Sequence, residues 1–168
     1  ALNEIAARHQ ALRTRFATNG SQPQQIVDPA TPIELAQSDL TGLRMEKRHA
    51  AAVEGAKDDG QKHFSLSDGH LLRLRLSKLE EDDHVLTVCL HHIISDGWSA
   101  AIFLRELSEY YHAAKTGTPV ESGPPVLHYA DYVHWLEQWR PDIEQRQLPY
   151  WQAQLANAPP LNLPTDHV

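Results

Sequence analysis

The chain has 168 residues, a formal net charge of −7 and a hydrophobic content of 41%. This length can bury one sizeable core, so we expect a single domain over residues 1–168. The acidic balance disfavours binding to nucleic acid, and no apolar run approaches the roughly 20 residues that cross a bilayer. A lone cysteine, Cys89, excludes an internal disulfide and a multi-cysteine metal site. No secretion signal is recognisable, so the expected compartment is the cytoplasm.

The first third of the chain is expected to hold a helix, two short strands and a second helix. The first helix is predicted from a stripe with spacings of three and four, formed by Leu2, Ile5, His9, Leu12 and Phe16. Residues 24–27 and 33–36 have short strand patterns punctuated by proline. Residues 43–60 are rich in alanine and charged side chains, which favours a half-exposed helix.

The middle of the chain carries the clearest pattern, which is that of a β-hairpin. Leucine alternates with arginine over residues 72–76, as in a strand with one solvent-facing side. Residues 85–92 are apolar on both faces, so we expect this second strand to be central in a sheet. A helix with one buried face is predicted to begin at Trp98 and to end near Lys115.

The C-terminal part is expected to be helical up to a proline-rich tail. Residues 116–125 hold two glycines and three prolines and are predicted to be a loop. Two helices are expected to follow, the last of them kinked or restarted at Pro149. Tyr132, Trp135 and Trp139 lie at helical spacing and are expected to fill a core. The tail over residues 158–168 has too many prolines for a helix.

Candidate catalytic residues lie between the hairpin and the next helix, in the segment that begins with His91 and His92. Neighbouring residues of a strand point to opposite faces, so only one of the two histidines can face a given cavity. His92 is expected at the end of the strand, close to a helix N-terminus whose free N–H groups suit a developing oxyanion. A histidine there can move a proton beside that oxyanion. Asp96 could either cap the helix or hold an arginine.

Four other interpretations remain open on residue chemistry alone. The histidine pair could be a structural or surface feature. A metal site would need ligands that converge, whereas adjacent strand histidines diverge. Ser95 lies near His92 and Asp96, as in a serine hydrolase, but no Gly-x-Ser-x-Gly elbow is present. Cys89 as a nucleophile is disfavoured by its position among apolar strand residues.

The segment LHHIISDGWS, residues 90–99, resembles the HHxxxDG signature of nonribosomal peptide synthetase condensation domains. Four further segments resemble other motifs of this family and occur in the family's order. They are RHQALRTRF at 8–16, FSL to LLR at 64–73, YADYVHW at 129–135, and YW to LPTD at 150–166. The resemblance extends over essentially the whole chain. Within the signature, the Ile-Ile-Ser run favours the subtype that accepts an L-residue donor.

The resemblance implies an α/β fold, a chloramphenicol-acetyltransferase-like lobe in which a central mixed sheet is flanked by helices. The chain would be the N-terminal lobe of a condensation domain, with residues 158–168 as an extended tail toward a missing C-terminal lobe. Its function would be amide (peptide) bond formation between carrier-protein-bound aminoacyl or peptidyl thioesters. The isolated lobe, with half of the tunnel, is expected to be inactive or nearly so.

The resemblance also assigns roles to individual residues. The catalytic set consists of His92, His91, Asp96 and Gly97. The residues that support the site are Arg13, Trp98 and Ser99. Within these sets His92 would be the catalytic histidine and His91 would support it, while Asp96 would pair with Arg13. Gly97 would offer its backbone N–H near the reacting thioester.

No cofactor or metal is expected to bind this domain itself. The resemblance implies a 4′-phosphopantetheine arm on each of two partners, the donor and acceptor peptidyl carrier proteins. The missing C-terminal lobe and neighbouring synthetase modules are the other expected partners. Two rival functions are a coenzyme-A-dependent acyltransferase of the same superfamily and a non-catalytic lobe that docks a carrier protein.

Overall fold

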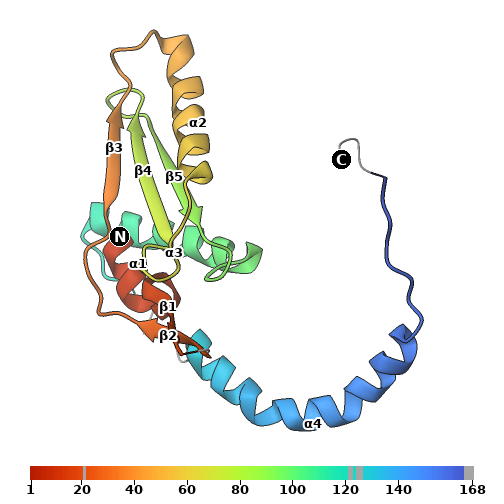
Figure 1. Cartoon of the computed structure of the whole chain (residues 1–168). Coiled ribbons are helices and arrows are strands. Elements are labelled where there is room, and N and C mark those ends of the chain that lie inside the picture. Colours follow the sequence, from red (N-terminus) through yellow and green to blue (C-terminus); the bar gives the residue numbers. More distant parts are fainter. Residues whose placement is uncertain (21, 121–122, 124–126, 165–168) are drawn as a thin grey trace. The chain divides into compact units, whose positions relative to one another are not determined.

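The computed structural model describes residues 1–20, 22–120, 123 and 127–164 (Figure 1). It divides into two compact units, residues 1–128 (unit 1) and residues 129–168 (unit 2). Part of the predicted loop at 116–125, namely residues 121–122 and 124–125, lies outside the described residues. No helix in the described part of the chain is both long enough and apolar enough to span a membrane.

The first residues of unit 1 form a short helix and then a strand, rather than one long helix. The elements are α1 (Leu2–Arg8), the 3-10 helix η1 (Gln10–Arg13), β1 (Thr14–Asn19) and β2 (Gln22–Val27), of which β1 and β2 pair antiparallel. The predicted helix through Phe16 is therefore wrong beyond Arg8. Thr14, Phe16 and Thr18 alternate along β1, and β-branched and aromatic side chains favour a strand.

The second sheet is mixed, as predicted, and has three strands among the described residues. The strands are β3 (Leu35–Asp39), β4 (Leu72–Lys78) and β5 (His84–Leu90). β4 lies in the middle, parallel to β3 and antiparallel to β5, so the predicted hairpin is confirmed. The expectation that β5 is central is wrong. Apolar side chains on both faces of a strand indicate that other elements pack on both faces of the sheet. A central position depends instead on hydrogen-bonded strands on both sides.

Helix α2, Met45–Gln61, confirms the helix predicted in this region and is fixed to β4 by an ion pair whose carboxylate is buried. The side chain of Asp59 is 4% exposed, and its carboxylate accepts hydrogen bonds from Arg75 Nε at 2.6 Å and Arg75 Nη2 at 2.9 Å. Lys62 Nζ donates to the same carboxylate at 2.8 Å. The bonds from Arg75 and then from Lys62 hold the pKa of Asp59 far below its ordinary value. The end of α2 is thereby tied to the middle strand.

Helix α3, Gly97–Thr116, confirms the helix predicted after the hairpin, and it packs against α1. Phe103 is buried on its inner face. Glu106, which is also buried, accepts a hydrogen bond from Arg8 Nε at 3.3 Å and lies 2.6 Å from His9 Nε2. Apolar packing and this polar cluster together fix the start of the chain on α3.

Unit 2 is dominated by one helix, α4, which spans Tyr129–Leu155. The expectation of two helices is wrong, because α4 continues through both Pro141 and Pro149. A proline removes one backbone hydrogen bond and crowds the preceding turn, which bends a helix without always ending it. Figure 1 shows α4 as a curved helix.

The aromatic stripe of α4 is not buried. Tyr132 and Trp135 are each 49% exposed, and Trp139 is 47% exposed. Their rings follow one another at centroid distances of 5.9 and 6.0 Å. The expectation that these side chains fill a core is therefore wrong within unit 2. Residues 158–164 form no helix, as predicted, and residues 165–168 lie outside the described residues.

Candidate active site

The candidate catalytic segment is a turn that joins β5 to α3 in unit 1. β5 ends at Leu90 and α3 begins at Gly97. His91 and His92 therefore lie beyond the strand, which ends two residues earlier than predicted. The different surroundings of the two histidines therefore come from the conformation of the turn and not from the alternation of strand side chains. The Ile94 N–H donates to the His91 carbonyl at 3.1 Å and closes this turn.

His91 is held by its backbone and by its ring. Its N–H donates to the Leu71 carbonyl at 2.9 Å, and its Nδ1 accepts the Ile93 N–H at 3.0 Å. The neutral ring therefore carries its proton on Nε2. The ring of Phe64 stands at 86° to the imidazole, with 5.8 Å between the centroids. His91 thus has a ring whose orientation is set by its neighbours.

His92 is the exposed member of the pair. Among the described residues, its imidazole has no hydrogen-bond, ion-pair or ring partner. The exposed side chain can contact another molecule, as a group that transfers protons to a substrate requires. The turn therefore separates one constrained histidine from one accessible histidine.

Asp96 caps the N-terminus of α3. Its Oδ1 accepts the Ser99 N–H at 2.8 Å and the Ser99 hydroxyl at 2.7 Å. The hydroxyl first, and then the backbone N–H, hold the pKa of Asp96 below its ordinary value. Of the two alternatives considered for this carboxylate, the structure shows the helix cap. Gly97 and Trp98, the first two residues of α3, are exposed.

The structure does not bring Arg13 and Asp96 together. Arg13 Nη1 instead donates to the carbonyl of Asp28, just after β2, at 2.5 Å. Arg13 Nε is buried and has no hydrogen-bond partner among the described residues. A buried donor without a hydrogen-bond partner costs free energy of folding. The Arg13 guanidinium therefore has one donor whose burial is not compensated in the described part of unit 1.

Replacing Ser99 with alanine is expected to raise the pKa of Asp96 toward the ordinary aspartate value of 3.8. The variant removes the hydroxyl donor but keeps the backbone N–H, so the rise should be partial. Titration of the Asp96 carboxyl carbon by NMR measures the change. Ser108→Ala is the matched control, because the Ser108 hydroxyl donates to the Leu104 carbonyl of the same helix. An unchanged pKa in Ser99→Ala would contradict the role of the hydroxyl in the cap.

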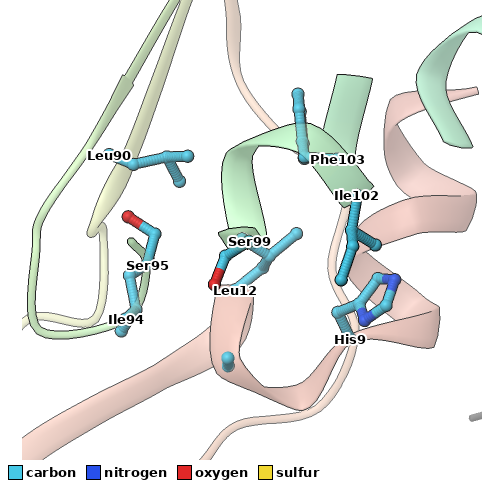
Figure 2. Close-up of a pocket in the computed structure, with 9 residues that line it drawn as sticks. His9, Leu12, Leu90, Ile94, Ser95, Ser99, Ile102 and Phe103 are labelled. Atoms are coloured by element: carbon cyan, nitrogen blue, oxygen red, sulfur yellow. The ribbon is translucent and has the colours of Figure 1, made fainter. Parts of the chain in front are cut away.

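A cavity of about 140 Å³ lies beside residues 91–96, which join β5 to α3 and which we call the motif turn (Figure 2). Its apolar walls include Leu12, Leu90, Ile94, Ile102 and Phe103. Figure 2 shows two hydroxyl-bearing residues at its lining, Ser95 on the turn and Ser99 on the first turn of α3. The sequence pattern around Leu12 indicates only a packing position, because no local spacing shows that Leu12 lines the same cavity as Ser99.

The hydrogen bonds of this segment do not form a serine-hydrolase site, and its residues do not form a metal site. The Ser95 hydroxyl donates to the His91 carbonyl at 3.3 Å rather than to an imidazole, and Asp96 accepts from Ser99. A serine–histidine–acid relay is therefore not formed. Within the described residues, no three His, Cys, Asp or Glu side chains gather as possible metal ligands. Cys89 is a partly buried free thiol of β5.

Sequence patterns do not single out Phe64 and Arg73, although both belong to the surroundings of the site. Arg73 Cζ lies 4.3 Å from the centroid of the Phe64 ring, and that ring contacts His91. The available signal is the resemblance of residues 64–73 to a family motif. Periodicity alone cannot reveal a contact between such distant segments.

Comparison with known proteins identifies the class to which the fold and the motif belong. A profile described as Condensation domain matches residues 1–168. Chondramide synthase cmdD of Chondromyces crocatus is 37% identical over 168 residues, which are 99% of this chain and 4% of that protein. The chain belongs to the condensation domain family and spans only a small part of the curated relatives it matches.

Solved structures show the same fold. The X-domain from teicoplanin biosynthesis, in its complex with OxyB, has a TM-score of 0.83 and 29% identity over 98% of this chain and 36% of that one. The first condensation domain of the CDA synthetase has a TM-score of 0.79 and 25% identity over 98% of this chain and 42% of that one. The fold is the predicted α/β fold of chloramphenicol-acetyltransferase-like proteins, with helices flanking a mixed sheet.

Proposed function

We propose that the chain is the histidine-bearing N-terminal lobe of a condensation domain that forms peptide bonds in nonribosomal peptide biosynthesis. The observation that carries this proposal is the motif turn, which constrains His91, caps α3 through Asp96 and leaves His92 accessible. Family membership over the whole chain supports it. Condensation domains of nonribosomal peptide synthetases are acyltransferases that form such bonds.

In the proposed reaction, the α-amine of the acceptor attacks the carbonyl carbon of the donor thioester. A C–N bond forms, the C–S bond breaks, and the donor thiol leaves with the proton that the amine loses. His92 takes this proton from the adduct or holds the amine in line for attack. Gly97 offers its N–H to the developing oxyanion, while Asp96 and Ser99 hold the helix start in place. In this proposal Trp98 and Arg13 support the site.

The proposed substrates arrive on donor and acceptor peptidyl carrier proteins, each through a 4′-phosphopantetheine arm. The chain covers 36% and 42% of the two solved structures described above, which supports a larger domain with a C-terminal lobe beyond residues 158–168. Alone, the chain should be inactive or nearly so, because half a tunnel cannot exclude water or fix two arms. The proposed further partners are neighbouring synthetase modules, and the proposed location of the protein is the cytoplasm.

A non-catalytic docking lobe is the second candidate function. This function is supported by one observation, which is that the similar X-domain was solved in complex with OxyB. A docking lobe would bind a loaded carrier protein without forming product. A coenzyme-A-dependent acyltransferase, the remaining rival, would instead use a soluble thioester as its donor.

The experiment supplies the remaining lobe, fused or in trans, with donor and acceptor carrier proteins that bear aminoacyl groups. Mass spectrometry then detects the dipeptidyl thioester. We expect product from the wild-type protein and loss of product in His92→Ala. Carrier binding without product from either version would favour docking. Product from an acyl-coenzyme A donor, but not from a loaded carrier, would favour the soluble-donor transferase.

A further inference from the structure

The His91 ring is the last member of a row of three side chains in unit 1, which we call the stacked row. Arg73 of β4 places its Cζ 4.3 Å from the centroid of the Phe64 ring. Phe64 stands edge to face with His91, with 5.8 Å between centroids and 86° between the ring planes. Both separations fall within the ranges for attractive cation–π and aromatic pairs.

The arginine end of the stacked row is anchored to backbone carbonyls at the end of α2. Arg73 Nη1 donates to the carbonyl of Asp59 and, at 3.4 Å, to that of Lys62. Arg73 Nη2 donates to the His63 carbonyl at 3.4 Å. Carbonyls at a helix C-terminus lack intrahelical partners and interact favourably with a cation. The guanidinium therefore cannot turn away from Phe64 without losing these bonds.

The histidine end of the stacked row is anchored in the motif turn. His91 Nδ1 accepts the Ile93 N–H at 3.0 Å, and His92 is the residue between them in the chain. The backbone of His92 is thus enclosed by two residues that are joined by a hydrogen bond. An imidazole that swung away from Phe64 would break this bond and release the peptide group that carries His92.

We propose that Phe64 and Arg73 are positioning residues that act on His92 through His91. The guanidinium fixes the Phe64 ring, the ring fixes the imidazole of His91, and that imidazole fixes the turn. This inference rests on the proposed role of His92 in amide bond formation. Misplacement of a reacting group by about 1 Å can cost on the order of a hundredfold in rate, so loss of one contact in the row should lower turnover measurably.

The test compares Phe64→Leu with Phe64→Tyr in the complete domain, because leucine removes the ring and tyrosine keeps it. We expect Phe64→Leu to lower kcat roughly tenfold with an unchanged KM for both loaded carriers, and Phe64→Tyr to stay within about twofold of wild type. Arg73→Lys should also lower kcat, because an ammonium lacks the planar fork that spans the carbonyls. Arg105→Lys, at an exposed arginine of α3, is the matched control.

A second readout does not depend on product formation. NMR signals of the His91 ring nitrogens report which nitrogen carries the proton, and we expect Nε2 in the wild type and in Phe64→Tyr. In Phe64→Leu these signals should shift toward a mixture of tautomers. Wild-type kcat and unchanged His91 signals in a folded Phe64→Leu would overturn the inference. Absence of product from the wild-type domain would instead refute the proposed function, and the His91 signals would still decide whether the stacked row orients the ring.

Discussion

Replacing His92 with alanine in the complete domain is expected to slow amide bond formation by at least about a hundredfold. His92 is exposed and has no side-chain partner among the described residues. Loss of its imidazole should therefore remove proton transfer or amine alignment while leaving the contacts of His91 and Asp96 intact. Single-turnover formation of the dipeptidyl thioester, followed by mass spectrometry, measures the effect.

The size and pH dependence of this loss separate two roles for His92. An α-amine has a pKa near 8, so about a tenth of the acceptor is uncharged at neutral pH. Deprotonating the free amine is therefore worth only about 1.4 kcal/mol, or roughly tenfold in rate. A hundredfold loss that persists at about pH 9 would assign His92 to the adduct or to alignment of the amine. A tenfold loss that disappears there would assign it to the free amine.

His84→Ala is the matched control for His92→Ala. His84 is also exposed, but it begins β5, whereas His92 follows the end of that strand. We expect the control to keep full activity. Full activity in His92→Ala would contradict its catalytic role, and equal losses in both variants would indicate a general defect in folding.

Replacing Asp59 with asparagine is expected to lower the free energy of unfolding by roughly 3 kcal/mol. The variant leaves Arg75, whose side chain is 22% exposed, without the carboxylate that accepts two of its hydrogen bonds. Urea unfolding followed by circular dichroism measures the loss. Asp58→Asn, at the exposed neighbouring position, is the control and should change the stability little. Equal stability of the two variants would contradict the importance of the ion pair between Asp59 and Arg75.

The difference in unfolding free energy between wild type and Asp59→Asn should become smaller in acid. The pKa of folded Asp59 lies below the ordinary value of 3.8, so the carboxylate contributes its full stabilisation above pH 3.8. This stabilisation is lost as the pH falls through the lowered pKa and the carboxylate is protonated. The difference in stability between wild type and variant should therefore be constant near neutral pH and should narrow below pH 3.8. A difference that stays the same in acid would show that another contact is responsible.

The fold could be predicted from the sequence where a pattern is local and long. α2, the hairpin of β4 and β5, and α3 all follow such patterns and are confirmed. The stripe from Leu2 to Phe16 is ambiguous, because Phe16 has helical spacing and also alternates with threonines. His9 decides the outcome: its backbone is extended, with φ −102° and ψ 106°, and its ring lies 2.6 Å from Glu106 of α3. That contact spans 97 positions and leaves no trace in a local pattern.

The candidate site could be located from the sequence, but the partners of its side chains could not. The motif alone identifies the histidine pair, and the alternative of a helix cap for Asp96 follows from its place before α3. The partner of Arg13 is different from the one that the resemblance implies, since a backbone carbonyl takes the place of a carboxylate. The contact of Phe64 with His91 joins separate segments, and only the folded chain brings them together.

Among the described residues, β5 has no strand on its side away from β4. Backbone N–H and C=O groups on that side have no strand partner in the described part of the chain and can pair with another strand. After His84, this strand contains no charged residue and no proline, which are the features that usually protect a sheet edge from self-association. When the chain is produced on its own, β5 should therefore be the segment through which copies aggregate at high concentration.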